Sequence, residues 1–144
     1  KSDGLFVTVD IPTRNGYKMW EETLDIVNRI FSLLPAKYQV DHAHFATPTV
    51  VDKIENIDYS KNSFECINSE AILPALRAHL REVDFVPALS IGRRFFDGIF
   101  GPNYNLTNPV DKTAFDFIMN LDEYYLYNNT LKPETFFGAY AKIG

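Results

Sequence analysis

The motif DHAH holds the side chains of this chain best suited to metal or acid–base chemistry. The surrounding segment, residues 38–46, alternates like a β-strand, so His42 and His44 are expected to project from one face. Two imidazoles at this spacing can share a metal ion, and His79 or Asp84 is the candidate third ligand. The chain has only three histidines and no cluster that completes a site. We therefore favour two hydrogen-bonded histidines and predict no metal and no other cofactor.

Two adjacent arginines, Arg93 and Arg94, precede the sequence FFDG. Neighbours on a strand point to opposite faces, so one of the two can clamp a carboxylate or phosphate, or pair structurally with an acid such as Asp97. The nearby glycines indicate a hairpin and do not form a phosphate-binding loop. A pocket that combines the histidines with an arginine is the alternative, enzymatic or ligand-binding interpretation, and its residues are His42, His44, His79, Arg93 and Arg94.

The single cysteine, Cys66, lies just before a predicted helix, where the helix N-terminus lowers the pKa of a thiol. The flanking sequence SFECINSE has carboxylates and no catalytic signature, so we interpret Cys66 as an incidental or buried thiol and predict no catalytic residue. One cysteine also excludes an internal disulfide and suits a reducing compartment, while a secreted domain without disulfides is the alternative. We expect a cytoplasmic protein.

Aromatic residues are concentrated after residue 84, where more than half of the 12 phenylalanines, eight tyrosines and one tryptophan lie. Rings at this density fill a core and often leave aromatic surface for a partner. In the segment DEYYLY, Tyr124 and Tyr127 share one side of a predicted helix while Tyr125 points elsewhere. At least one ring is expected to face solvent beside Asp122 and Glu123, as an interaction anchor or as a surface ring whose hydroxyl meets water.

The first half of the chain is predicted to contain a strand, a long helix and a second strand. Residues 5–11 are β-rich, and residues 17–34 have helical spacing with Asn15 or Thr13 as the cap. Residues 48–57 form either a short helix or an edge strand. The apolar face of the long helix is predicted to comprise Trp20, Leu24, Val27, Phe31 and Leu34, widened by Ile26, Ile30 and Leu33.

The second half begins with a helix that reaches about residue 82, with Pro74 in its first turn and Ile72, Leu76, Leu80 and Val83 on one face. A strand at residues 85–91 precedes a hairpin in RRFFDGIFG, because Asp-Gly is a strong turn signal. Asn108-Pro109 begins another helix, and Pro133 begins a last short one. The buried side of the helix after Pro109 is predicted to comprise Val110, Ala114, Phe117, Ile118, Leu121 and Tyr125. This order predicts one α+β domain over residues 1–144, with a mostly antiparallel sheet and helices packed mainly on one face.

Composition excludes several classes of protein. The chain has 144 residues, 46% of them hydrophobic and 23% charged, which is typical of a globular domain and not of a disordered one. No apolar run approaches the roughly 18 residues of a membrane span, so no membrane association is predicted. The net charge of −5 argues against nucleic-acid binding. Most of the acidic excess lies in the first 70 residues, which favours a basic protein partner.

The opening LFVTVDIPTRNGYKMWEETLDIVNRIFSLLP is a strand that leads into a Trp-bearing helix ending in Leu-Pro. With its size, acidity and α+β order, the chain resembles the small acidic immunity proteins that bacteria encode beside polymorphic or secreted toxins. The resemblance covers mainly the first 35 residues and assigns no individual site residue. It implies a non-enzymatic protein that binds and occludes a cognate toxin, often a basic nuclease.

We therefore predict a protein-binding inhibitor, either monomeric or homodimeric, whose acids speed the encounter and whose aromatic anchors prolong the complex. The candidate acids lie on the polar side of the long helix and are Glu21, Glu22 and Asp25. The candidate anchors are Tyr124 and Tyr127.

Overall fold

The computed structural model describes residues 4–43 and 47–143, and within them the chain forms two compact units. Residues 4–20, 56–89 and 133–143 form one, which we call the sheet unit. Residues 21–55 and 90–132 form the other, the helical unit. The chain passes repeatedly from one unit to the other, so no linker in the sequence marks their boundary. The expectation of a single domain over residues 1–144 stays a prediction.

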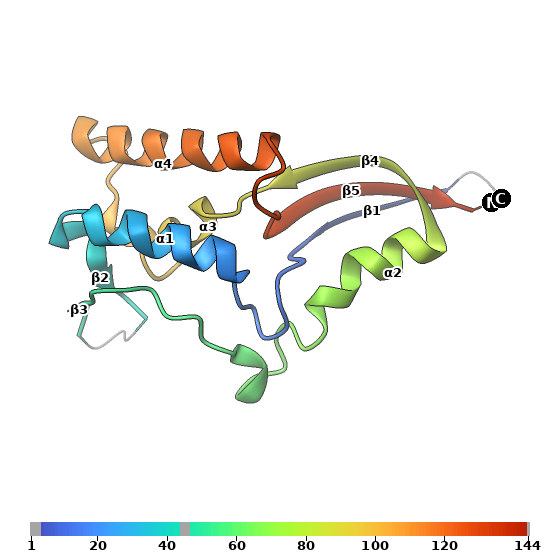
Figure 1. Cartoon of the computed structure of the whole chain (residues 1–144), viewed down its shortest axis with the longest axis horizontal. Coiled ribbons are helices and arrows are strands. Elements are labelled where there is room, and N and C mark those ends of the chain that lie inside the picture. The colour runs from blue at the N-terminus through green and yellow to red at the C-terminus, as the bar shows by residue number, and fades with distance from the viewer. Residues whose placement is uncertain (1–3, 44–46, 144) are drawn as a thin grey trace. The chain divides into compact units, whose positions relative to one another are not determined.

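The sheet unit is built on three antiparallel strands, β1 (Leu5–Asp10), β4 (Leu80–Ala88) and β5 (Thr135–Lys142). Their order in space is β1-β5-β4, so β5 is central and the other two strands are edges (Figure 1). Two 3₁₀ turns, Tyr59–Lys61 and Ser69–Ala71, precede helix α2 (Ile72–His79). The antiparallel sheet combined with helices confirms the predicted α+β class.

The two faces of this sheet differ in what covers them. On the inner face the rings of Phe85 and Phe136 stack with their centroids 5.3 Å apart. Helix α2 lies on this face, where the Arg77 guanidinium sits 5.0 Å from the centre of the Phe85 ring (Figure 1). Cross-strand partners share a face, so the outer face is given by the pairs between Val7 and Ala139 and between Val86 and Phe137. Exposed apolar side chains line this outer face: Leu5, Val7, Val9, Val86 and Phe137.

The last segment of the chain is a strand, so the prediction of a helix after Pro133 was wrong. Phe136 and Tyr140 point to the inner face while Phe137 and Ala139 point to the outer one, which is the period of a strand. The Tyr140 ring is fully buried and folds over the backbone of Gly138. A Cβ atom added at Gly138 would lie 2.4 Å from the Cε2 atom of Tyr140, so only glycine fits beneath the ring.

Replacing Gly138 by alanine is expected to destabilise the protein by about 1–3 kcal/mol, because the buried Tyr140 ring must move. In a helix, as the sequence predicted, the same change would stabilise by about 1 kcal/mol. Urea unfolding distinguishes the two signs. Gly4→Ala is the matched control, since no atom lies within 4 Å of its added Cβ. A stabilised Gly138→Ala variant would contradict the strand.

The helical unit is formed by α1 (Glu21–Leu33), the short α3 (Gly92–Phe95) and α4 (Pro109–Tyr127). Figure 1 shows α1 and α4 running in opposite directions. Two-residue strands β2 (Val40–Asp41) and β3 (Thr49–Val50) pair beside the 3₁₀ turns Ala36–Gln39 and Gly101–Asn103. Fully buried apolar side chains from α1, α3 and α4 form the core: Val27, Phe31, Ile91, Phe95 and Ile118.

Helix α4 begins where the sequence predicted. The Asn108 side chain accepts hydrogen bonds from the backbone N–H groups of Val110 and Asp111, at 2.9 and 3.3 Å. Pro109 occupies the first helical position, where its missing N–H group has no cost. This cap confirms the predicted boundary.

Other boundaries differ from the prediction. The strand expected at 38–46 is a 3₁₀ turn followed by two strand residues, with residues 44–46 outside the described part. Helix α1 begins at Glu21 and not at Tyr17, because Tyr17 has a φ of +66° and lies inside the turn closed by the Arg14–Lys18 bridge. Helix α2 ends at His79, so Leu80 and Val83 belong to β4.

The predicted Asp-Gly hairpin is also absent from the described residues, because Arg93 and Arg94 lie in helix α3. Asp97 instead accepts the N–H groups of Ile99 and Phe100 with its side chain, at 2.8 and 3.1 Å. This local bonding makes an Asx-type turn that takes the place of the paired strands.

Candidate functional site

Helix α4 presents a row of apolar side chains to solvent. Val110 is 70% exposed, Phe117 62%, Tyr124 63% and Tyr127 90%. These residues follow one another at seven- and three-residue intervals, so they lie on one side of the helix. We call them the α4 stripe. The exposure confirms that at least one of the tyrosine rings faces solvent, whereas the prediction that Val110 and Phe117 are buried was wrong.

The opposite side of α4 is buried and carries two acids. Ile118 and Leu126 supply its apolar part. Asp122 is 1% exposed and accepts hydrogen bonds from the backbone N–H groups of Ser90 and Gly92, at 2.8 and 2.9 Å. Burial raises the pKa of Asp122, and the backbone hydrogen bonds oppose that rise. Asp122 therefore holds the start of α3, and it is not the surface acid that the sequence suggested.

Asp111, one turn into α4, is saturated with hydrogen-bond donors. It accepts bonds from the Lys37 ammonium, from the Tyr38 hydroxyl at 2.8 Å and from the Asn105 N–H group at 2.9 Å. The Lys37 bond is the largest cause that lowers the pKa of Asp111 to about 2. Burial raises the pKa of Tyr38. Asp111 is therefore ionised at neutral pH and accepts three hydrogen bonds. This arrangement suits a structural role, in which Asp111 joins these segments, and not a general base.

Two acids flank the α4 stripe. Asp116 precedes Phe117 and Glu123 precedes Tyr124, so both lie along the same border of the row. Glu123 is exposed, and Asp116 is half-buried and pairs with Lys112 at 2.5 Å. Lys112 offsets the charge of Asp116, so the net negative charge along this border comes from Glu123. The sequence grouped Glu123 with the tyrosines and missed Asp116.

The candidate acids of α1 are all exposed, and ion pairs with basic side chains offset part of their charge. Asp25 bonds Arg29 at 2.9 Å, and Glu22 lies 3.8 Å from the Lys132 ammonium. The second pair brings the start of α1 to the segment that follows the tyrosine end of α4. The negative patch on α1 is thus weaker than its three acids alone would make it, and its role in binding stays a prediction.

The residues of the alternative pocket occupy different environments. The Nε2 atom of His42 lies 2.9 Å from the Asn103 Oδ1 atom, while His44 lies outside the described residues. His79 ends α2 in the sheet unit, whereas His42 belongs to the helical unit. Arg93 and Arg94 are both buried in α3, at 7% and 6% exposure. The expectation that these arginines alternate on a strand was wrong, because both lie in helix α3.

No three metal-ligating side chains come together among residues 4–43 and 47–143. Cys66 is half-buried and has a positive φ of 52°. It lies ahead of the 3₁₀ turn that leads into α2, and its carbonyl accepts a hydrogen bond from the Gly16 N–H group at 2.8 Å. The backbone of Cys66 thus joins the loop before α2 to the turn at Gly16.

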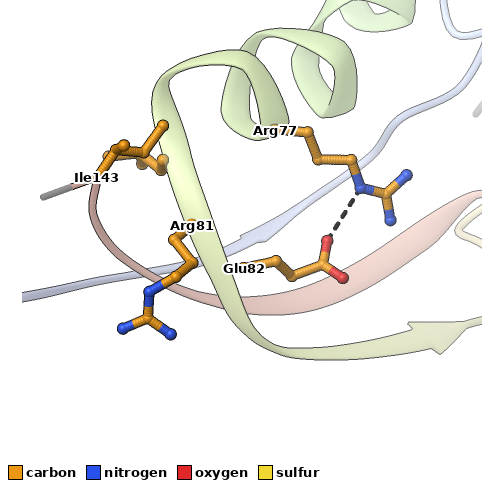
Figure 2. A pocket seen from close by; sticks show the side chains of 5 residues that line it. Arg77, Arg81, Glu82 and Ile143 are labelled. Carbon is orange, nitrogen blue, oxygen red and sulfur yellow. Dashed lines mark hydrogen bonds and ion pairs between the residues drawn. The ribbon is translucent and has the colours of Figure 1, made fainter.

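A shallow depression of about 470 Å³ lies on the sheet unit where α2 meets β4, and Ile143 borders it (Figure 2). Arg77 bonds Glu82 at 3.0 Å, and Figure 2 shows Arg81 on the other side of the β4 ribbon from this pair. The residues that line the depression are Arg77, Leu80, Arg81, Glu82 and Ile143. The one carboxylate in this lining, Glu82, is paired with Arg77, and the lining includes no histidine, cysteine, serine or tyrosine, so it shows no nucleophile with an adjacent base.

Fold and surface together define an α+β protein whose most distinctive exposed feature is an aromatic helix face bordered by acids. Comparison of the chain with protein families, with curated proteins and with solved structures gives no match. In the part of the chain that the structure describes, no helix is long and apolar enough to cross a membrane.

Proposed function

We propose that this chain is a protein-binding inhibitor of the immunity type, which neutralises a cognate basic toxin by covering part of its surface. The observation that carries the proposal is the exposure of Tyr124 and Tyr127 on the same side of α4 as Phe117. Tyrosine and phenylalanine supply large contact areas at low cost in side-chain entropy, and they are enriched in protein interfaces. A row of such rings in contact with water is unfavourable unless a partner covers it.

The charges beside the stripe favour a basic partner. Glu123 and the Lys112–Asp116 pair lie on one border of the row, so a basic rim on the toxin would meet one net negative charge there. Two copies of α4 that paired in antiparallel orientation would instead bring this acidic border against itself. The net charge of −5 adds long-range attraction for a basic protein. A cytoplasmic location suits this role and a chain with one cysteine, Cys66.

The alternative, a small enzyme or a ligand-binding domain, has less support. It needs His42, His79 and an arginine to converge on one ligand. The His42 ring already bonds Asn103. Asp111 is occupied by three donors, so it supplies no free base. We therefore prefer the binding function.

The test is binding to the protein encoded by the adjacent gene, with association measured at low and high salt. Glu21→Lys/Glu22→Lys is expected to slow association roughly tenfold at low salt and to flatten its salt dependence, because the reversal removes electrostatic steering. Dissociation should change little. Asp52→Lys/Glu65→Lys is the matched control, since both acids are exposed, lie outside α1 and give the same change in net charge.

Two results would contradict this proposal. An association rate that is independent of salt and unchanged by the Glu21 and Glu22 reversals would exclude the electrostatic part. No detectable complex with the neighbouring gene product would exclude immunity-type inhibition of that protein.

A further inference from the structure

Strand β1 leaves an open edge on the sheet unit. Among the described residues it pairs with β5 alone, so half of its backbone N–H and C=O groups point away from the sheet. Its outer face is apolar, with Leu5 61% exposed, Val7 55% and Val9 69%, and on its inner face Phe6 is 49% exposed beside Thr8 and Asp10. An edge of this kind is a template for another strand.

The other edge of the same sheet is protected against pairing. Strand β4 changes register between Glu82 and Asp84, which is a bulge that interrupts regular pairing. Pro87 removes one N–H donor, and Arg81, Glu82 and Asp84 place charges along the strand. Residues 5–9 contain no charge, no proline and no bulge. The β4 edge therefore disfavours pairing with another strand, whereas the β1 edge remains accessible to one.

We propose that two copies of this chain pair through antiparallel β1 strands and so join their sheets into one continuous sheet. Residues directly opposite in an antiparallel pair must share a face, which limits the possible registers. A two-fold axis at Val7 places Val7 opposite its own copy, Leu5 opposite Val9, and Phe6 opposite Thr8. Every outer-face pair in this register is then aliphatic.

The neighbouring registers are less favourable. An axis at Thr8 would place Asp10 against Phe6, which covers a carboxylate with an aromatic ring. An axis at Phe6 would leave Val9 beyond the paired segment. With the axis at Val7, Asp10 lies opposite Gly4, so no like charges meet.

The absence of charged side chains along residues 5–9 favours a second copy of this chain as the strand that pairs with β1. A basic partner would find no acid along residues 5–9, so the attraction proposed for the helical unit does not act at this edge. Two acidic chains repel each other over most of their surfaces. Residues 5–9 of β1 carry no charge, so two copies can pair there without placing like charges opposite each other. This inference does not rest on the proposed function, because it concerns only the sheet unit.

Sedimentation equilibrium of the 144-residue chain tests the proposal. The unchanged protein is expected to dimerise in a concentration-dependent manner, and Val7→Lys is expected to abolish the dimer by placing two lysines opposite each other. Val86→Lys is the matched control, because Val86 is 49% exposed on the same outer face but lies on β4. Circular dichroism verifies that both variants keep their fold.

Cysteine cross-linking tests the register in a Cys66→Ser background. Val7→Cys is expected to form a disulfide with its own copy under mild oxidation, since only this position meets itself. Val9→Cys alone should not cross-link, whereas a mixture of Leu5→Cys and Val9→Cys chains should. A monomer at all concentrations up to about 1 mM would overturn the proposal. So would a dimer that Val7→Lys leaves intact, or one that Val86→Lys disrupts, because face-to-face packing would then hold it.

Discussion

Replacing Phe31 by alanine is expected to lower the free energy of unfolding by about 3–5 kcal/mol, the range for a fully buried phenylalanine. The Phe31 ring has no exposed surface, and its centroid lies 5.2 Å from that of Phe100 and 6.4 Å from that of Phe95. The alanine variant loses the transfer energy of the ring and leaves a cavity among these aromatic neighbours, which the surrounding helices can fill only in part. Urea unfolding measures the loss.

Leu33 provides the matched control on the same helix. It is 85% exposed, although the sequence placed it beside Phe31 on the apolar face. Leu33→Ala is therefore expected to change the unfolding free energy by no more than about 0.5 kcal/mol. A Phe31→Ala variant that loses less than about 1 kcal/mol would mean that α1 does not form the core of the helical unit.

The elements that the sequence predicted correctly are those with local signals. The periodicity of α1 identifies Val27 and Phe31 as buried, because one helical face repeats within a few residues. The Asn108 cap fixes the start of α4 through hydrogen bonds to residues only two and three positions away. Both the periodicity of α1 and the Asn108 cap involve residues that are close together in the sequence.

The elements that the sequence missed depend on distant partners. Residues 133–143 contain a proline that suits a helix start, but Phe136 pairs with Asp10 on one side and Pro87 on the other. These partners are far away along the chain, so no local pattern reveals that β5 is the central strand. The two-residue strands β2 and β3 are likewise too short to leave a period in the sequence.

The candidate site was predicted only in part, for a similar reason. Helix α4 has apolar residues on two sides, one with Ile118 and Leu126 and the other with Val110 and Phe117. Sequence periodicity shows that such sides exist, but packing against the rest of the unit decides which one is covered. The tyrosines were identified because Tyr124, Tyr125 and Tyr127 cannot all face inward. The buried position of Asp122 depends on Ser90 and Gly92, about 30 residues earlier, and left no local signal.

Truncation of the tyrosines is expected to have the largest effect on the proposed complex. Tyr127→Ala, and separately Tyr124→Ala, should speed dissociation from the adjacent gene product by about 2 kcal/mol, or roughly thirtyfold, if these rings are hot spots. Association should change little, because an uncharged ring adds no steering. Surface plasmon resonance at fixed salt separates the two rates.

The folded state should tolerate these changes, which makes the dissociation rate informative. Tyr127 is 90% exposed and Tyr124 63%, so their removal should alter the unfolding free energy by no more than about 0.5 kcal/mol. Phe64→Ala is the matched control, since Phe64 is 94% exposed on the sheet unit and lies outside the α4 stripe. Equal effects of Phe64→Ala and Tyr127→Ala on dissociation would show that the α4 stripe is not the specific contact. Unchanged dissociation in both tyrosine variants would remove the α4 stripe from the interface, because a partner seated on it must cover these two rings.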